Sequence, residues 1–218
     1  MFYTIFVWIS GLICFIIGSS IAIIFYPIDL WKNRSGDLVH LVSRYFAQVL
    51  LWVSRIKIEV KGLENLYTDR AQLICANHQS LFDIPILDSI LPIQFRFVVK
   101  KELYAVPILG LCLKYEQQVQ LDRESRRKGM ESIQKAADLI GKGRSVVVFP
   151  EGTRSTDSQI KKFRKGSLLI ASVSKAPVVP VSINGSFNIM SKKSFRLRPG
   201  NVKIVISPPI KTSKKEIL

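Results

Sequence analysis

The stretch Leu73-Ile74-Cys75-Ala76-Asn77-His78-Gln79-Ser80-Leu81-Phe82-Asp83 decides how the centre of this chain folds. Its first four residues form a short apolar run that is typical of a buried strand. Its last residue opens a segment with helical character, which Leu91 and Pro92 end. The polar turn between these two elements carries His78. A strand, a turn and a helix in this order predict one unit of an α/β fold.

His78 and Asp83 stand five positions apart. Five residues of a straight helix rotate the chain by roughly 140°, so the two side chains would not share a helix face. They converge more easily if His78 lies in the turn after the strand and Asp83 in the first turn of the helix. Ser80, three residues before Asp83, resembles the start of a capping box, and Pro85 is tolerated in a first helical turn. An imidazole with a carboxylate to hold its tautomer can deprotonate an alcohol. The alternative interpretation is that His78 and Asp83 form an ordinary polar contact without a catalytic role.

Further along the chain, short apolar runs alternate with segments of helical periodicity. We expect strands at residues 56–60, 95–99, 145–149, 178–183 and 202–206, and helices at residues 83–90, 124–140 and 167–174. Strands that alternate with helices predict an α/β fold with a mixed, largely parallel sheet flanked by helices.

The chain begins with its strongest apolar signal. Residues 2–26 contain no charged side chain, and this length can cross a bilayer core of about 30 Å. No Lys or Arg precedes the run, and it is longer than the core of a signal peptide, so we expect a retained membrane anchor. Residues 38–56 are apolar with polar interruptions, which suits a second, amphipathic helix. Residues 1–56 therefore predict an N-terminal membrane-anchoring helical segment or a two-helix hairpin.

The linker between these two helices carries Trp31, Lys32 and Arg34. Two complete crossings would place this basic linker on the opposite side of the membrane from the rest of the chain, against the positive-inside tendency. A single crossing or a shallow hairpin in the cytoplasmic leaflet agrees better, and we favour the hairpin. Residues 57–218 are then expected on the cytoplasmic side of a membrane.

The formal net charge is +16, and every Lys and Arg lies beyond residue 30. Nucleic acid is one partner that such a charge would suit, but no basic segment has the spacing of a nucleic-acid motif. The apolar start of the chain favours an anionic membrane surface as the partner instead. The three residues Cys14, Cys75 and Cys112 lie in apolar contexts, which is typical of buried thiols in a reducing compartment. Neither they nor His40 show metal-ligand spacing, so no metal site is expected.

A second motif, Phe149-Pro150-Glu151-Gly152-Thr153-Arg154-Ser155, follows another apolar strand. Sheets of α/β proteins bind ligands at the carboxyl ends of their strands. Gly152 lets the backbone approach a ligand, Thr153 adds a hydroxyl, and the planar fork of Arg154 suits a phosphate. A carboxylate would repel such a ligand, so Glu151 is expected to orient Arg154 or a loop amide. A polar surface turn is the plainer alternative.

The two motifs follow short apolar strands, so a sheet can bring them to the same edge. An alcohol-activating imidazole would then lie beside a phosphate-binding guanidinium. The chemistry that this arrangement indicates is acylation, or another transfer, at the hydroxyl of an amphiphilic phosphate.

The segments NHQSLFD (residues 77–83) and FPEGTRS (residues 149–155) resemble the Asn-His-x4-Asp and Glu-Gly-Thr-Arg motifs of the 1-acyl-sn-glycerol-3-phosphate acyltransferases, in the glycerolipid acyltransferase superfamily. Four further segments resemble blocks of this family in the same order: VKKELYAVPILG (residues 99–110), VQLDR (residues 119–123), FRKG (residues 163–166) and VVPVSI (residues 178–183). The resemblance covers residues 55–210. It is specific because the whole set occurs in order.

The resemblance implies transfer of a fatty acyl group to the sn-2 hydroxyl of lysophosphatidate, which forms phosphatidic acid in phospholipid biosynthesis. It implies no bound cofactor, since the donor is the thioester of acyl-CoA or of acyl carrier protein. His78 would be the general base and Asp83 its orienting partner. The substrate-binding residues would be Lys100, Arg123, Glu151, Gly152, Thr153 and Arg154, and the strand at residues 178–181 would line the acyl site.

The resemblance also assigns residues 57–218 to an acyltransferase domain. The last residues, Ser213 to Glu216, have the pattern of a helix start, which leaves open either a frayed end or a piece of a longer protein.

Other functions stay open from the sequence. The same chemistry could act on glycerol-3-phosphate, another lysophospholipid or a lyso-aminolipid. A membrane lipid-binding protein without catalysis would leave the spacing of His78 and Asp83 unexplained. A covalent acyl-serine is disfavoured, because neither Ser80 nor Ser155 lies in a Gly-x-Ser-x-Gly elbow.

Overall fold

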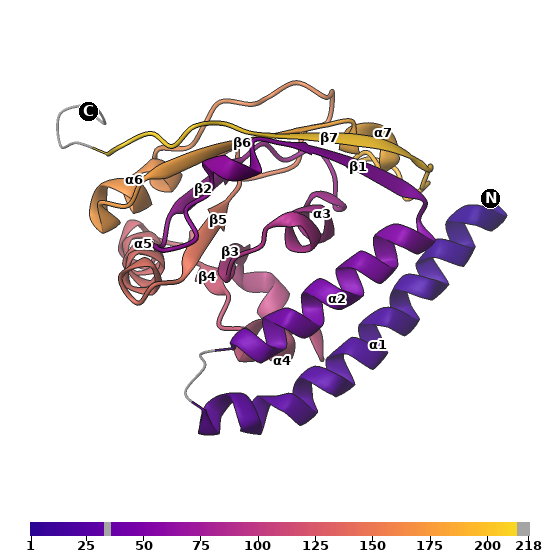
Figure 1. Ribbon diagram of the computed structural model, residues 1–218, viewed down its shortest axis with the longest axis horizontal. Coiled ribbons are helices and arrows are strands. Elements are labelled where there is room, and N and C mark those ends of the chain that lie inside the picture. The colour runs from indigo at the N-terminus through magenta and orange to yellow at the C-terminus, as the bar shows by residue number, and fades with distance from the viewer. Residues whose placement is uncertain (33–35, 213–218) are drawn as a thin grey trace.

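Seven strands form one sheet, in the order β1-β7-β6-β2-β5-β3-β4, in the computed structural model, which describes residues 1–32 and 36–212 (Figure 1). The strands are β1 (Ile56–Lys61), β2 (Leu73–Ala76), β3 (Phe95–Lys100), β4 (Val119–Leu121), β5 (Ser145–Val148), β6 (Val178–Asn184) and β7 (Gly200–Ile206). Neighbouring strands are parallel, except for the antiparallel pair β6 and β7. The predicted mixed, largely parallel sheet is confirmed.

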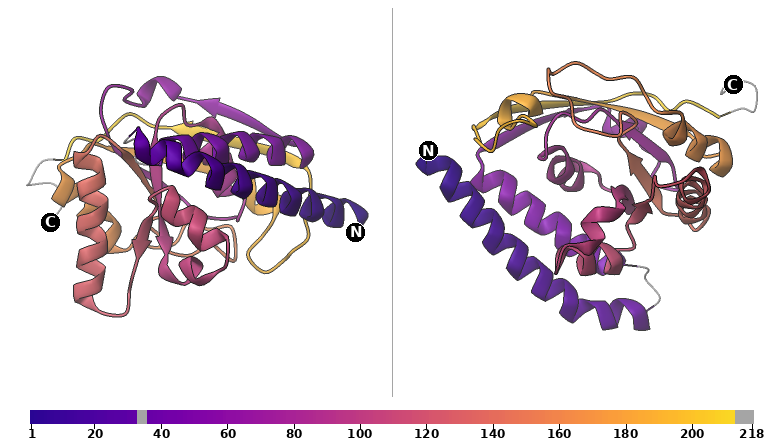
Figure 2. Two further views of the ribbon diagram at one scale, coloured as in Figure 1. Left: turned by 90° about the horizontal axis from the view of Figure 1, so that it is seen from below. Right: turned by 180° about the vertical axis from the view of Figure 1, so that it is seen from behind.

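Helices cover both faces of this sheet. They are α1 (Phe2–Trp31), α2 (Asp37–Val53), α3 (Asp83–Ile90), α4 (Leu109–Tyr115), α5 (Arg126–Gly141), α6 (Lys165–Ser174) and α7 (Ser186–Ile189), with short 3-10 turns at Leu63–Asn65 and Lys101–Ala105. Helices α5 and α6 lie together on one side, whereas α3 and the long pair α1 and α2 lie on the other (Figures 1 and 2).

The central strands are apolar throughout because both of their faces are buried. In β5, Val146 and Val148 pack in a cluster with side chains of α5 and α6, while Val147 packs with the cluster on the α3 side. Leu73 and Ile74 of β2 divide between the same two clusters. Parallel strands that are covered on both sides produce continuous apolar runs of this kind.

Helices α1 and α2 pack side by side as a hairpin along one side of the molecule (Figure 2). Within the described residues, α1 is the helix that is long and apolar enough to cross a membrane. Both of its ends contact the rest of the protein. The Tyr3 hydroxyl donates to the Ser54 carbonyl at 2.6 Å, and the Tyr26 ring stacks on Tyr115 with 3.6 Å between centroids. The predicted cationic linker residue Arg34 and the predicted helix start at Ser213 to Glu216 lie outside the described residues.

The starts of α5 and α3 differ in detail from the sequence-based expectation. The helix expected from residue 124 begins at Arg126, because the Ser125 hydroxyl caps it by accepting from the Lys128 amide at 3.2 Å. Ser80 is not the N-cap of α3; Phe82 occupies that position. The Ser80 hydroxyl instead donates to the Met190 carbonyl at 2.8 Å. Of the two hydrogen bonds of the expected capping box, the one from the Ser80 amide to the Asp83 carboxylate is therefore the one that forms.

Candidate active site

The two motifs meet at the carboxyl edge of the sheet. Strands β2 and β5 are parallel neighbours, so the turn after β2 and the loop after β5 leave the same edge. The His78 amide donates to Glu151 Oε1 at 2.7 Å, and the Ser155 amide donates to the His78 carbonyl at 2.8 Å. The predicted convergence of the two loops is confirmed.

His78 and Asp83 form a direct pair. His78 Nδ1 lies 2.8 Å from Asp83 Oδ2, and the amides of Gln79 and Ser80 donate to the same oxygen at 2.7 and 2.8 Å. Asp83 is fully buried, so these three donors fix the carboxylate at the start of α3. With Nδ1 donating to Asp83, the ring nitrogen left as a base is Nε2.

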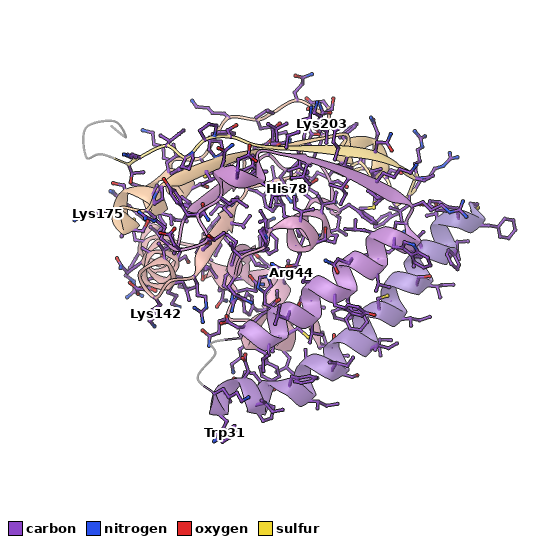
Figure 3. The ribbon with its side chains drawn as sticks, in the orientation of Figure 1. Trp31, Arg44, His78, Lys142, Lys175 and Lys203 are labelled. Carbon is purple, nitrogen blue, oxygen red and sulfur yellow. The ribbon has the colours of Figure 1, made fainter. Side chains whose placement is uncertain are left out.

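The imidazole of His78 faces a cavity. Its ring stacks on Phe149 with 4.0 Å between centroids, which fixes the plane of the ring. Nε2 makes no hydrogen bond to any described residue, and His78 is part of the cavity wall. Figure 3 places His78 between the sheet and the helical hairpin, whereas Lys142 and Lys175 lie on the far side, away from the hairpin.

The second histidine is differently placed. His40 is 1% exposed, its Nε2 lies 3.0 Å from Asp88 Oδ1, and its Nδ1 lies 2.7 Å from Gln94 Oε1. Because both ring nitrogens are occupied inside the protein, this His–Asp pair joins α2 to α3 and β3 and has no nitrogen available to a substrate. His78 is the histidine that can act as a base in the cavity.

Glu151 connects the two motifs and, among the described residues, forms no hydrogen bond or ion pair with Arg154. It is 2% exposed, and while Oε1 accepts from the His78 amide, Oε2 accepts from the Lys161 amide at 2.9 Å. Of the two roles expected for this carboxylate, orienting a loop amide is the one that its contacts support.

Arginine side chains converge on Gly152. Arg123 Nη1 donates to the Gly152 carbonyl at 3.3 Å, and Arg164 Nε donates to the Glu151 carbonyl at 3.4 Å. Gly152 has φ +70°, and a Cβ there would lie 2.8 Å from a nitrogen of both guanidinium groups. The glycine is therefore required for the approach of these two cations to the backbone.

The positive charges of this cluster form no ion pair within the described residues. Together with Arg154, which lines the same cavity, Arg123 and Arg164 make no ion pair with any described carboxylate. Burial and, next, the neighbouring Arg164 guanidinium lower the pKa of Arg123, while the Glu102 carboxylate acts in the opposite direction. A bound phosphate would offset this repulsion.

More cations line the cavity than the sequence predicted. Lys100 and Thr153 are among the lining residues, as expected, and Lys192 donates to Thr153 Oγ1 at 2.8 Å. The predicted set did not include Arg164, Lys165 and Lys192. The basic run after the second motif was a signal for the first two. Lys192 had no signal in the sequence, because it comes from a loop far along the chain.

The cavity extends from His78 and the arginine cluster to the helical hairpin. Its volume is about 1360 Å³. Apolar side chains from α1, α2, the turn after β2, β3 and α4 line it, including Phe15, Phe46, Leu81, Phe97 and Leu113.

The expectation that residues 178–181 line this cavity is wrong. Val179 and Val181 are buried in the sheet core instead. The reason is the strand order, because β6 lies on the opposite side of β2 from β5.

Comparison with known proteins identifies the class of protein to which this chain belongs. Residues 57–184 match the family model described as Acyltransferase, which places the chain in the acyltransferase class. A chloroplastic 1-acyl-sn-glycerol-3-phosphate acyltransferase of Arabidopsis thaliana, LPAT1, is 32% identical over 95% of this chain. The 1-acyl-sn-glycerol-3-phosphate acyltransferase of Cocos nucifera is 31% identical over 96% of this chain and 67% of its own length. The chain belongs to the 1-acyl-sn-glycerol-3-phosphate acyltransferase family.

A solved structure supports the same assignment. The crystal structure of the 1-acyl-sn-glycerophosphate acyltransferase PlsC from Thermotoga maritima superposes with a TM-score of 0.72 at 27% identity, covering 96% of this chain and 91% of that one. The chain spans 56% and 52% of the length of two chloroplastic relatives, from Arabidopsis thaliana and Brassica napus.

Proposed function

We propose that this protein transfers a fatty acyl group from an acyl thioester to the sn-2 hydroxyl of 1-acyl-sn-glycerol-3-phosphate, forming phosphatidic acid. One observation carries the proposal. An imidazole whose Nε2 makes no hydrogen bond within the described residues, held by a buried carboxylate, lines the same cavity as an arginine cluster that forms no ion pair with a described carboxylate. The names of the relatives, 1-acyl-sn-glycerol-3-phosphate acyltransferase for two of them and 1-acyl-sn-glycerophosphate acyltransferase for PlsC, support this choice of acceptor.

The proposed reaction is direct acyl transfer. Nε2 of His78 accepts the proton of the sn-2 hydroxyl while its oxygen attacks the thioester carbonyl. Collapse of the tetrahedral intermediate breaks the carbon–sulfur bond, and the imidazolium returns the proton to the departing thiolate. The charge of Asp83, 2.8 Å from Nδ1, stabilises the imidazolium between these two steps and holds the reactive tautomer.

Charge that develops on the carbonyl oxygen needs hydrogen-bond donors. The Gly152 amide donates to the Phe149 carbonyl at 2.9 Å and is therefore occupied. The amides of Thr153 and Arg154 make no backbone hydrogen bond within the described residues, and both residues line the cavity. These two amides are our candidates for the oxyanion site.

The acceptor phosphate would bind the cations around Gly152. Arg154 and Arg123 supply guanidinium forks, and Lys100 adds a point charge at the cavity edge. Arg164, the N-cap of α6, and the first residues of that helix, Lys165 to Ser167, lie in the same wall, so the positive end of the helix adds to the attraction for an anion. The apolar part of the cavity would hold the acyl chains.

We place the protein on the cytoplasmic side of a membrane, with α1 and α2 lying in one leaflet. The outer surface of α1 is apolar, whereas α2 buries His40 against α3 and β3. A helix so closely packed on the sheet domain is not free to cross the bilayer by itself. Contacts at both ends of α1 hold it along α2, which favours a shallow hairpin over a crossing. The net charge of +16 suits an anionic leaflet.

The deciding experiment measures acyl transfer by the purified full chain. Radiolabelled acyl-CoA and acyl carrier protein thioesters are each offered with lysophosphatidate, glycerol-3-phosphate, lysophosphatidylethanolamine and a lyso-aminolipid. We expect the highest kcat/KM with lysophosphatidate, and a loss of roughly 10²-fold or more in kcat for His78→Ala, which should stay folded and membrane-bound. Near-normal turnover by that variant would remove the base assignment. Binding of lysophosphatidate without any product would favour the lipid-binding alternative.

A further inference from the structure

A loop after α7 reaches both the cavity and the helical hairpin. Residues 190–199 connect α7 with β7. At the start of this loop the Met190 carbonyl accepts from the Ser80 hydroxyl at 2.8 Å. Near its end the Leu197 amide donates to Thr4 Oγ1 of α1 at 3.2 Å, and Trp8 Nε1 donates to the Phe195 carbonyl at 3.0 Å. Because hydrogen bonds to Ser80, in the turn that carries His78, and to α1 hold this loop near its two ends, they fix the position of Lys192 between them.

Lys192 reaches across to the second motif. Its Nζ donates to Thr153 Oγ1 at 2.8 Å, and its side chain lines the same cavity as His78 and Arg154. An ammonium group has three donors, and the hydroxyl of Thr153 uses one of them. No carboxylate of the described residues forms an ion pair with Lys192, and residues 190–202 contain no acidic side chain. Two donor directions and a full positive charge are left for a ligand.

The charge of the site distinguishes between headgroups. A phosphate monoester carries roughly −1.5 to −2 charges near neutral pH and presents three acceptor oxygens, whereas a phosphodiester carries a single charge. The guanidinium groups of Arg123, Arg154 and Arg164 already supply more positive charge than a diester can neutralise. Since the Coulomb energy scales with the product of the charges, an additional point charge at Lys192 attracts the more highly charged ligand more strongly than the diester.

We propose that Lys192 is an acceptor-specificity residue, whose ammonium binds the phosphate monoester of the acceptor and makes the site prefer it over phosphodiester or uncharged headgroups. The inference rests on the proposed function, in that the acceptor is a lyso-lipid. It adds a residue from outside the two motifs, supplied by the loop that α1 holds in place.

The test compares Lys192→Gln with a matched control, Lys193→Gln. Lys193 is the next residue of the same loop, is exposed, does not line the cavity and makes no hydrogen bond or ion pair within the described residues. Acceptor KM is measured for lysophosphatidate and for lysophosphatidylglycerol in the same micelles, with one thioester donor. We expect Lys192→Gln to raise the KM for lysophosphatidate on the order of tenfold, the effect of one charge-assisted hydrogen bond, and the KM for lysophosphatidylglycerol much less. The donor KM and the kinetics of Lys193→Gln should match the wild type, and Lys192→Arg should restore most of the preference.

Two results would overturn the inference. One is an unchanged KM for lysophosphatidate in Lys192→Gln. The other is an equal rise for both acceptors together with weaker co-sedimentation with phosphatidylglycerol vesicles, which would assign Lys192 to the bilayer surface.

A binding measurement separates failure of this inference from failure of the proposed function. The affinity for lysophosphatidate is measured in the His78→Ala background, with and without Lys192→Gln, so that no turnover is needed. A loss of affinity of about tenfold supports the inference even for a protein that acylates none of the acceptors. Equal affinities overturn it even for a wild type that is active.

Discussion

Replacing Glu151 by Gln should lower activity even though the Glu151 side chain is not expected to contact a substrate. The two carboxylate oxygens of Glu151 accept from the amides of His78 at 2.7 Å and Lys161 at 2.9 Å, in a site that is 2% exposed. A Gln side chain has one oxygen and one NH2 group. It can accept from one amide only, and its NH2 group would face the donor of the other.

The size of the effect follows from these contacts. One buried N–H loses its acceptor, at a cost of about 1–3 kcal/mol, and the remaining bond loses its charge, so the free energy of unfolding should fall by about 2–4 kcal/mol. For a protein of this length, that corresponds to a thermal midpoint lower by about 5–15 °C. A shift of the His78 backbone moves the base relative to the hydroxyl, and a displacement of about 1 Å can cost 10²-fold in rate. We therefore expect kcat to fall roughly 10- to 100-fold, with acceptor KM nearly unchanged.

The assay is steady-state acyl transfer together with thermal unfolding of the same preparation. Glu131→Gln is the control, because the Glu131 side chain is 55% exposed on α5 and should tolerate the change. A wild-type kcat with a changed acceptor KM would refute the reasoning, since it would mean that Glu151 contacts the acceptor instead of positioning the turn that carries His78.

Three further predictions concern the cavity. Arg154→Ala should raise the acceptor KM more than the thioester KM, and Arg154→Lys should restore it only in part, because a point charge does not replace a planar fork; an unchanged acceptor KM would argue against phosphate binding. Gly152→Ala should also raise the acceptor KM while the protein stays folded, as its Cβ would lie 2.8 Å from the guanidinium groups of Arg123 and Arg164 and displace them; wild-type kinetics would show that the cluster tolerates this shift. A non-hydrolysable acyl thioester analogue should slow maleimide labelling of Cys112, which lines the cavity, as followed by peptide mass spectrometry. Cys75 should stay unlabelled at pH 8 with or without the analogue, because burial raises the pKa of its thiol to about 12 and leaves little thiolate. If Cys112 is labelled at the same rate with and without the analogue, the acyl chain does not bind in the part of the cavity that Cys112 lines.

Local patterns in the sequence were sufficient for most of the regular elements. The apolar run at residues 73–76 is strand β2, and the helix expected at residues 83–90 is α3 with the same bounds. Such segments are predictable because side-chain period and end signals act over a few residues. The short helix α4 was missed, since its seven residues give too little periodicity to separate it from a loop.

The sequence by itself determined that two polar turns follow apolar strands, and the parallel pairing of β2 and β5 then made His78 and the Glu151 loop neighbours. Only the tertiary structure decided the rest of the site. It placed the β6 strand away from the cavity and brought Arg164 and Lys192 into it. These positions depend on strand order and on a loop held between α1 and the turn that carries His78, which are contacts between residues far apart in the chain. Local periodicity carries no information about such contacts, because each segment has the same pattern whichever neighbour it packs against.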